Sequence, residues 1–346
     1  MTQPVTWRRY AVLAALLVLV LLWGLRSGSL PIGWSDLANS LWGGAETSAN
    51  QPLYRTVVWD IRLPRLLMAA LIGAGLAISG ACLQALFRNP LAEPTILGIT
   101  SGATAFALGT MILAPGFFLL LTSLLGVATL PLLASLGAAS TLALMLVLAR
   151  QHSFDPNRVI LIGIAINVFA GAIISVCAYV ASDQQLRILS FWGLGSLAAA
   201  TWNKIPLLLV AIGLGTAIIV AHARFLNALL LGESEAHHLG FSVKRAKQWC
   251  LLGVTLISGS AVAFTGMIGF VGLVMPHIMR LLFGPNHRHL LWYSAMAGAG
   301  LLVFADTLAR TLIAPIEMPV GIITALIGGP FFVILLMYSR LWHPNT

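Results

Sequence analysis

The chain has 346 residues, of which 59% are hydrophobic and 8% are charged, and its formal net charge is +9. A soluble globular protein carries about 25% charged residues, so this composition cannot cover a water-facing surface and excludes an ordinary soluble domain. The positive charge does not indicate nucleic-acid binding, because the 19 Lys and Arg residues are scattered through short loops, as is usual in membrane proteins.

Apolar segments follow one another along the chain and predict an all-α polytopic membrane protein, with about ten transmembrane helices in a single domain over residues 1–346. The first segment follows Arg8 and Arg9 without a small-residue cleavage motif behind it, so we interpret it as a span. The fourth is too long for one helix, and Pro131 is predicted to kink or break it. The predicted spans are Tyr10–Leu25, Pro64–Leu86, Thr95–Leu113, Leu119–Leu148, Val159–Ala181, Lys204–Ala221, Trp249–Phe270, Gly272–Phe283, Leu290–Leu312 and Val320–Leu341.

The distribution of charge predicts that both termini are cytoplasmic. Ten spans put the two termini on one side, and an inside N-terminus places 12 of the 19 basic residues and all eight His residues in the cytoplasm. Arg62, Arg65 and Arg310 then lie at the outer side, against the trend. The longest inner loop is 222–248, and the outer segment 182–201 contains a short amphipathic helix.

Small residues are concentrated at 73–81 and 298–300, which predicts close helix packing rather than a binding site. A weak internal similarity links residues 80–94 with 266–280. Each runs from a small-residue helix into a turn that contains proline, and the two start from opposite sides of the membrane. This pattern predicts an inverted internal repeat, which is common in transporters.

Several kinds of chemistry are absent from the sequence. It contains no Walker-type ATP motif, no catalytic motif and no clustered metal ligands, so we expect no metal site and no cofactor bound by this chain. Cys82, Cys177 and Cys250 lie in apolar runs without CxxC spacing. Acidic residues in the apolar spans are few, with Asp306 and Glu317 as the exceptions. This scarcity disfavours an ion-coupled secondary transporter, and the missing motifs disfavour a membrane enzyme.

Segments spread over nearly the whole chain resemble the FecCD family of permeases, which import iron chelates, haem and vitamin B12. The similar segments occur in family order. They are Ile61-Arg-Leu-Pro-Arg65, Gly73-Ala-Gly-Leu-Ala-Ile-Ser-Gly80, Gln84-Ala-Leu-Phe-Arg-Asn-Pro-Leu-Ala-Glu-Pro94, Leu97-Gly98, Ser101-Gly102, Leu231-Gly-Glu-Ser-Glu-Ala-His-His-Leu-Gly240, Ile268-Gly-Phe-Val-Gly-Leu-Val-Met-Pro-His277, Leu308-Ala-Arg310 and Met318-Pro-Val-Gly-Ile-Ile-Thr-Ala325.

The resemblance implies the permease subunit of a type II ABC importer, not an enzyme, in the inner membrane of a bacterium, with a Gram-negative source favoured. It implies a homodimer of permeases surrounded by lipid, with substrate passing between the two copies. Two copies of a separate ATPase, which hold ATP and Mg, would bind the cytoplasmic side. A periplasmic binding protein would deliver the substrate. No nucleic-acid partner is expected.

The resemblance also assigns roles at the two ends of the molecule. Arg62, Arg65 and Arg310 would receive acidic residues of the binding protein, since guanidinium groups pair well with carboxylates. The alternative is interfacial anchoring, or an internal pair with Asp60 or Asp306. The inner gate would consist of Asn89, Leu91, Pro156 and Asn157.

Within loop 222–248, a short helix closed by Gly240 would couple the permease to the ATPase, the alternative being a solvated loop. A bulky change at Ala236 or Gly240 is expected to uncouple hydrolysis from transport while leaving the fold intact. The coupling residues are Gly232, Glu233, Ala236, Leu239 and Gly240.

The outer helix suggests the substrate, because its Phe191-Trp192-x-Leu-Gly-Ser-Leu pattern is most similar to the haem permeases of the family. The predicted pathway residues are Tyr179, Arg187, Phe191 and Trp192. Arg187 could pair with a haem propionate, with a siderophore carboxylate or, internally, with Asp183. We therefore expect import of haem, with a ferric siderophore or cobalamin as alternatives.

Overall fold

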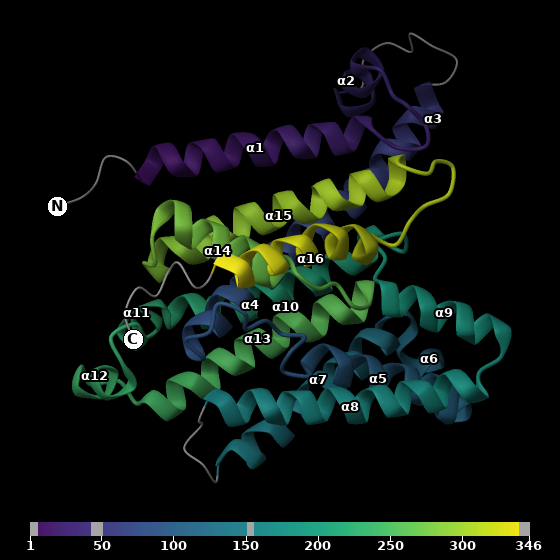
Figure 1. Cartoon of the computed structure of the whole chain (residues 1–346). Helices are drawn as coiled ribbons and strands as arrows, with labels where there is room; N and C mark the ends of the chain where they lie inside the picture. Colours follow the sequence, from purple (N-terminus) through teal and green to yellow (C-terminus); the bar gives the residue numbers. More distant parts are fainter. Residues whose placement is uncertain (1–5, 43–50, 151–155, 339–346) are drawn as a thin grey trace.

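The computed structural model describes residues 6–42, 51–150 and 156–338, and every regular element in these ranges is helical (Figure 1). The helices are α1 (Thr6–Arg26), α2 (Trp34–Trp42), α3 (Gln51–Thr56), a π-helical stretch (Val57–Arg62), α4 (Leu63–Leu86), α5 (Ile99–Leu113), α6 (Pro115–Leu125), α7 (Thr129–Arg150), α8 (Pro156–Val180), α9 (Asp183–Leu194), α10 (Ile205–Ala221), α11 (Ala223–Leu229), α12 (Glu233–His238), α13 (Val243–Thr265), α14 (Val271–Phe283), α15 (His287–Thr311) and α16 (Val320–Tyr338).

Seven helical segments in the described ranges are long and apolar enough to cross a membrane, and α5, α14 and α16 are shorter apolar helices. The prediction of an all-α polytopic membrane protein is therefore confirmed. Several boundaries differ from the predicted ones; α13 (Val243–Thr265), for example, begins six residues before the predicted span Trp249–Phe270 and ends five residues before that span does. Helix continues without a gap from Gln51 to Leu86, and the fourth predicted span is interrupted at Gly126–Ala128 instead of at Pro131. Pro131 lies in the first turn of α7, where a missing N–H does no harm.

Helices α4, α13 and α15 are mostly buried and form the centre of the bundle, whereas α1, α8 and α10 keep most of their residues at the surface. The centre is held together by glycines in direct contact. A methyl group on Gly73 would overlap the backbone of Gly298, and one on Gly80 would overlap the carbonyl oxygen of Gly272. The predicted role of the small-residue clusters in close packing is thus confirmed.

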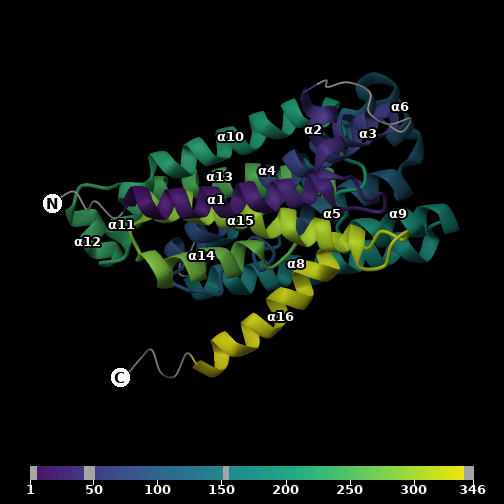
Figure 2. The same ribbon diagram turned by 90° about the horizontal axis from the view of Figure 1, so that it is seen from above.

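The two ends of the bundle carry different short helices. Helices α11 and α12, the first turn of α1 and the last turn of α16 lie at one end, while α2, α3 and α9 lie at the other (Figures 1 and 2). We call these the inner and the outer end, following the predicted orientation. The described ends of the chain thus share one end of the bundle, while the number of spans and the side on which the termini lie stay predictions.

Two helices are too short to cross the membrane alone. Helix α5 has 15 residues and α14 has 13, so at 1.5 Å per residue they are about 20 Å long, against a hydrocarbon core of about 30 Å. Helix α14 lies toward the inner end and α5 toward the outer end (Figure 2). Helix α5 follows the first similar segment, 80–94, whereas α14 lies largely within the second, 266–280, and the inverted repeat itself stays a prediction.

Candidate transport site

The outer arginines form a buried ion-pair network between α4 and α15. Both Nε and Nη2 of Arg65 lie 2.9 Å from Oδ1 of Asp306, whose side chain is fully buried. Nη1 of Arg65 lies 2.7 Å from Oε2 of Glu317. Nε of Arg310 approaches Oδ2 of Asp306 at 3.1 Å, as an ion pair without hydrogen-bond geometry. The alternative of an internal pair with Asp306 is correct for both arginines.

The same arginine cluster closes the outer end of α1. Arg62 donates to the carbonyl oxygens of Leu25, Arg26 and Leu30, and Arg310 donates to that of Gly24 at 3.2 Å. These carbonyls belong to or follow the last turn of α1, where backbone acceptors have no partner within the helix. The cations also oppose the negative pole of the helix dipole.

Burial corrects the prediction that Arg62, Arg65 and Arg310 form an accessible docking surface. Their exposed fractions are 3%, 4% and 5%, and each guanidinium donates to acceptors within the chain. Arg26 and Arg55 are exposed at the same end. Sequence position alone placed Arg62, Arg65 and Arg310 at the outer side and could not show that their side chains are buried.

Helix α9 confirms the predicted short outer helix. Ser182 and Gln185 cap its first turn reciprocally, since each side chain bonds to the backbone N–H of the other residue. Arg187 is exposed and, within the described ranges, forms no ion pair with Asp183. Its guanidinium is therefore available to an anionic group.

The remaining predicted pathway residues differ in exposure. Tyr179, at the end of α8, is 91% exposed, and Phe191 is 50% exposed. Trp192 is only half-exposed, because its ring packs against the cluster of Leu108 and Cys177. Trp192 therefore holds α9 against the bundle, and Tyr179 and Phe191 are the ones that present their rings outward.

The last turn of α9 is joined to the non-helical linker 266–270, which connects α13 with α14. The amide of Met267 donates to the carbonyl oxygen of Trp192 at 2.9 Å, and the amide of Ser196 donates to that of Thr265 at 2.7 Å. Gly266 has a φ of +72° and its Cα faces the backbone of Trp192, so only glycine fits there.

The predicted gate residues Asn89 and Leu91 lie in the loop 87–98, which we call the gate loop. Helix α4 ends in a Schellman motif, in which the amide of Asn89 donates to the carbonyl of Gln84 at 3.2 Å and Arg88 has a φ of +47°. Oδ1 of Asn89 accepts from the amide of Leu91 at 2.9 Å, which fixes the turn. The side chains of Pro156 and Asn157 lie outside the described parts of the structure.

Glu93 is a residue of the gate loop that sequence reasoning did not single out. Its side chain is buried, and Oε2 accepts from the amide of Phe270 at 3.2 Å. Its other oxygen accepts from the hydroxyl of Thr95. A carboxylate inside a predominantly apolar stretch was the available signal, because a buried charge needs specific partners.

The coupling segment contains the predicted short helix, α12. The amide of Phe241 donates to the carbonyl of Ala236 at 3.2 Å and Gly240 has a φ of +87°, so the helix is closed at Gly240 as predicted. Nζ of Lys247 lies 2.7 Å from Oε1 of Glu233, which ties α12 to α13. Leu239 is 60% exposed.

Ala236 corrects one expectation about the coupling segment. Its side chain is fully buried on the packed face of α12. A bulky side chain there would therefore displace the helix instead of leaving the fold intact. Gly240 is also unsuited to substitution, because L-residues rarely adopt its positive φ. Leu239 is the position at which a surface change can be tested.

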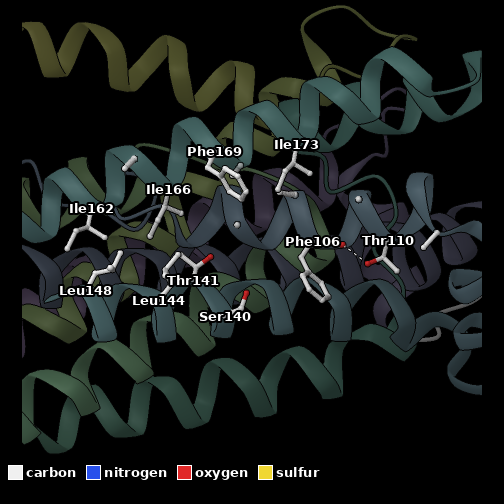
Figure 3. A pocket seen from close by; sticks show the side chains of 16 residues that line it. Phe106, Thr110, Ser140, Thr141, Leu144, Leu148, Ile162, Ile166, Phe169 and Ile173 are labelled. Carbon is white, nitrogen blue, oxygen red and sulfur yellow. Dashed lines mark hydrogen bonds between the residues drawn. The ribbon is translucent and has the colours of Figure 1, made fainter. Parts of the chain in front are cut away.

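An apolar cavity of about 690 Å³ lies between α5, α7 and α8 (Figure 3). The rings of Phe106 and Phe169 project into it from opposite walls, and the hydroxyl of Thr110 is bonded to the carbonyl of Phe106. Among the described side chains, none that lines the cavity is charged. It can therefore receive an apolar group by van der Waals contact, but it offers no ionic partner.

In the part of the chain that the structure describes, no group of three or more His, Cys, Asp or Glu side chains could hold a metal ion. Cys82, Cys177 and Cys250 are buried and free. We identify no candidate cofactor site in these ranges. The predicted absence of a cofactor stays a prediction.

The fold and the site together define the membrane permease class of transporters: a helical bundle with the apolar helices α5 and α14 too short to cross a membrane alone, a short helix α12 at one end and no ATP motif in the sequence. The chain belongs to the FecCD transport family, whose family model matches residues 16–338. It is thus a permease subunit of the type II ABC importer class.

Curated and solved relatives cover almost the whole chain. It is 44% identical to the hemin transport system permease protein HmuU of Yersinia pestis, over 93% of this chain and 95% of that protein. It is 41% identical to the cobalamin import system permease protein BtuC of Halobacterium salinarum, over 82% and 73% of the two chains. A solved inward-facing conformation of a proposed metal-chelate type ABC transporter has a TM-score of 0.79 at 31% identity, covering 94% of this chain and 97% of that one.

Proposed function

We propose that this chain is the permease subunit of an ATP-driven importer that moves haem from a periplasmic binding protein into the cytoplasm. The observation that carries the choice of haem is the 44% identity to the hemin permease over 95% of that protein, against 41% over 73% of the cobalamin permease. Two copies of the permease and two ATPase subunits would form the membrane complex, in the inner membrane of a Gram-negative bacterium.

The chemistry of the outer end supports the proposal. Haem presents an apolar macrocycle and two carboxylates, and α9 presents the exposed ring of Phe191 beside the exposed guanidinium of Arg187. The described His residues are His222 between α10 and α11, His237 and His238 of α12, His277 of α14, and His287 and His289 in the first turn of α15, and none lies in α9 or in the other short helices of the outer end. Contacts at the outer end would therefore be apolar and ionic without iron ligation by imidazole, which suits weak and transient binding.

The substrate is tested with the assembled complex in proteoliposomes. The binding protein is supplied together with haem, a ferric siderophore or cobalamin, each in a separate assay. We expect ATP-dependent uptake and ATPase stimulation with haem. Uptake of cobalamin or of the siderophore without uptake of haem would refute the substrate and leave the importer class standing.

Arg187→Ala is expected to raise the KM for haem by a factor of about 1.4 to 5, because an exposed ion pair contributes about 0.2–1 kcal/mol. The maximal rate should change little. Initial rates of uptake at several haem concentrations measure both quantities. Arg187→Lys keeps the charge and should lie closer to wild type, and Arg224→Ala at the inner end is the control. An unchanged KM in Arg187→Ala would remove this residue from the pathway.

Leu239→Arg is expected to weaken binding of the ATPase about tenfold or more, because it places a charge on an exposed apolar side chain of the coupling helix. Pull-down of the ATPase by purified permease, at graded concentrations, measures the effect. Leu53→Arg, on exposed α3 at the outer end, is the matched control. Equal binding by both variants would show that α12 does not contact the ATPase.

A further inference from the structure

We propose that Glu93 is a positioning residue that fastens the gate loop to the linker 266–270, and that this linker connects the inner gate mechanically with α9 at the outer end. The inference rests on the proposed transport function, because it assigns a route by which docking of the binding protein would reach the inner gate. It concerns this chain's own contacts and no bound ligand.

The linker is attached to the gate loop through the Glu93 carboxylate. Its side chain is 7% exposed, and Oε2 accepts from the amide of Phe270 at 3.2 Å. Phe270 precedes the first turn of α14 and has no side-chain cap of its own. A carboxylate supplied from the gate loop therefore satisfies a backbone donor at the positive end of a helix. Removing this contact would leave the part-buried amide of Phe270 unpaired.

The gate loop would follow Glu93 as a unit. Leu91 is two residues before Glu93, and its amide is held by Oδ1 of Asn89 at 2.9 Å. The amide of Ala92 donates to the carbonyl of Asn89 at 3.1 Å. Because these bonds close the turn between Asn89 and Ala92, a displacement of Glu93 has to move the predicted gate residues with it.

At the outer end, the linker is attached to the last turn of α9. The amide of Met267 bonds to the carbonyl of Trp192 at 2.9 Å, and Gly266 packs on the backbone of the same residue. The start of α16 is seated there too, because a methyl group on Gly321 would overlap the carbonyl of Leu194. Backbone-to-backbone contact of this kind leaves no side chain free to rotate and absorb a movement of α9.

The linker is too short to absorb a displacement of one attachment relative to the other. Only three peptide bonds separate Met267 from Phe270, so at about 3.4 Å per residue they span roughly 10 Å. Between the two attachments, the ring of Phe270 packs directly on Gly328 of α16. A shift of α9 must therefore be passed to Phe270 and Glu93, or the hydrogen bonds at one attachment must break.

A second side chain holds the same gate loop without touching the linker, which provides a matched control. Nδ2 of Asn167 on α8 donates to the carbonyls of Thr95 and Ile96 at 3.0 and 3.2 Å. Loss of Asn167 would loosen the gate loop locally. Loss of Glu93 would loosen it and also disconnect it from α9.

The physical link is tested by hydrogen–deuterium exchange of the full-length permease in nanodiscs, for wild type, Glu93→Leu, Glu93→Gln and Asn167→Leu. In Glu93→Leu we expect faster exchange in the gate loop, in residues 266–271 and at 192–196. In Asn167→Leu the increase should stay within the gate loop and α8. Glu93→Gln keeps an acceptor oxygen and should resemble wild type. Exchange at 266–271 that does not respond to Glu93→Leu would overturn the link.

The signalling role is tested with the same variants in the complete complex, as the ratio of ATPase rates with and without substrate-loaded binding protein. Glu93→Leu should lower this ratio at least about threefold, in the range expected for mutations between coupled sites. Asn167→Leu should lower it less, and Glu93→Gln should restore it. An equal loss in both Leu variants would overturn the signalling role. A wild-type complex without stimulation would refute the proposed function and the role with it, while the exchange data would still decide the link.

Discussion

Asp306→Ala is expected to lower the free energy of unfolding by about 3–5 kcal/mol, the effect of removing one partner from a buried ion pair. Asp306 is fully buried between Arg65 and Arg310, so the substitution would leave two buried guanidinium groups close together, with only the half-exposed Glu317 to balance them. The effect is measured as the fraction of monodisperse protein and the midpoint of thermal unfolding in detergent. Both should decrease.

Glu317→Ala is the matched control for Asp306→Ala, because it removes the other carboxylate of Arg65. The Glu317 side chain is 42% exposed, and Arg65 keeps its bonds to Asp306. We expect a loss of about 1 kcal/mol or less from this variant. If Asp306→Ala unfolds no earlier than Glu317→Ala, the arginine cluster does not stabilise the outer end in the way proposed.

Gly80→Ala is expected to destabilise the bundle by about 3 kcal/mol, the upper part of the range for overpacking a core. The added methyl group would overlap the carbonyl oxygen, carbonyl carbon and Cα of Gly272, which are backbone atoms and cannot rotate away. Helices α4 and α14 would have to separate. Because this contact also places the start of α14 beside the gate loop, transport should fall together with stability.

Gly171→Ala tests whether the Gly80 effect comes from close packing and not from any change of a helical glycine. A methyl group on Gly171 of α8 would meet nothing within 4 Å. Alanine favours helix over glycine by roughly 1 kcal/mol, so this variant should be as stable as wild type or slightly more stable. Similar unfolding midpoints for Gly80→Ala and Gly171→Ala would contradict the packing argument.

Much of the fold follows from local sequence. The predicted eighth span, Gly272–Phe283, agrees with α14 within one residue, and Gly240 closes α12 as its position suggests. Pro131 was misleading, because a proline is harmless in the first turn of a helix and disruptive only further inside. The actual break lies at Gly126, where φ is positive.

The candidate site was predicted less completely. Leu239, Tyr179 and Arg187 are exposed as a surface role requires, whereas Ala236 and Trp192 are wholly or partly buried. Asp183 stands one helical turn before Arg187, which made an ion pair a reasonable alternative, yet the structure has none between them. Rotamer and neighbours decide such pairs, and neither can be read from spacing.

The sequence alone determined that the chain is a bundle of membrane helices with small residues at its contacts, because hydropathy and glycine content are local properties that lipid selects segment by segment. Only the tertiary structure decided what the polar residues do. Asp306 is 241 residues from Arg65, and Phe270 is 177 residues from Glu93. No local pattern encodes partners so far apart. A buried charge must nevertheless find them, so Arg65 is part of the internal framework and Glu93, in the role that we propose, fastens the gate loop to the linker.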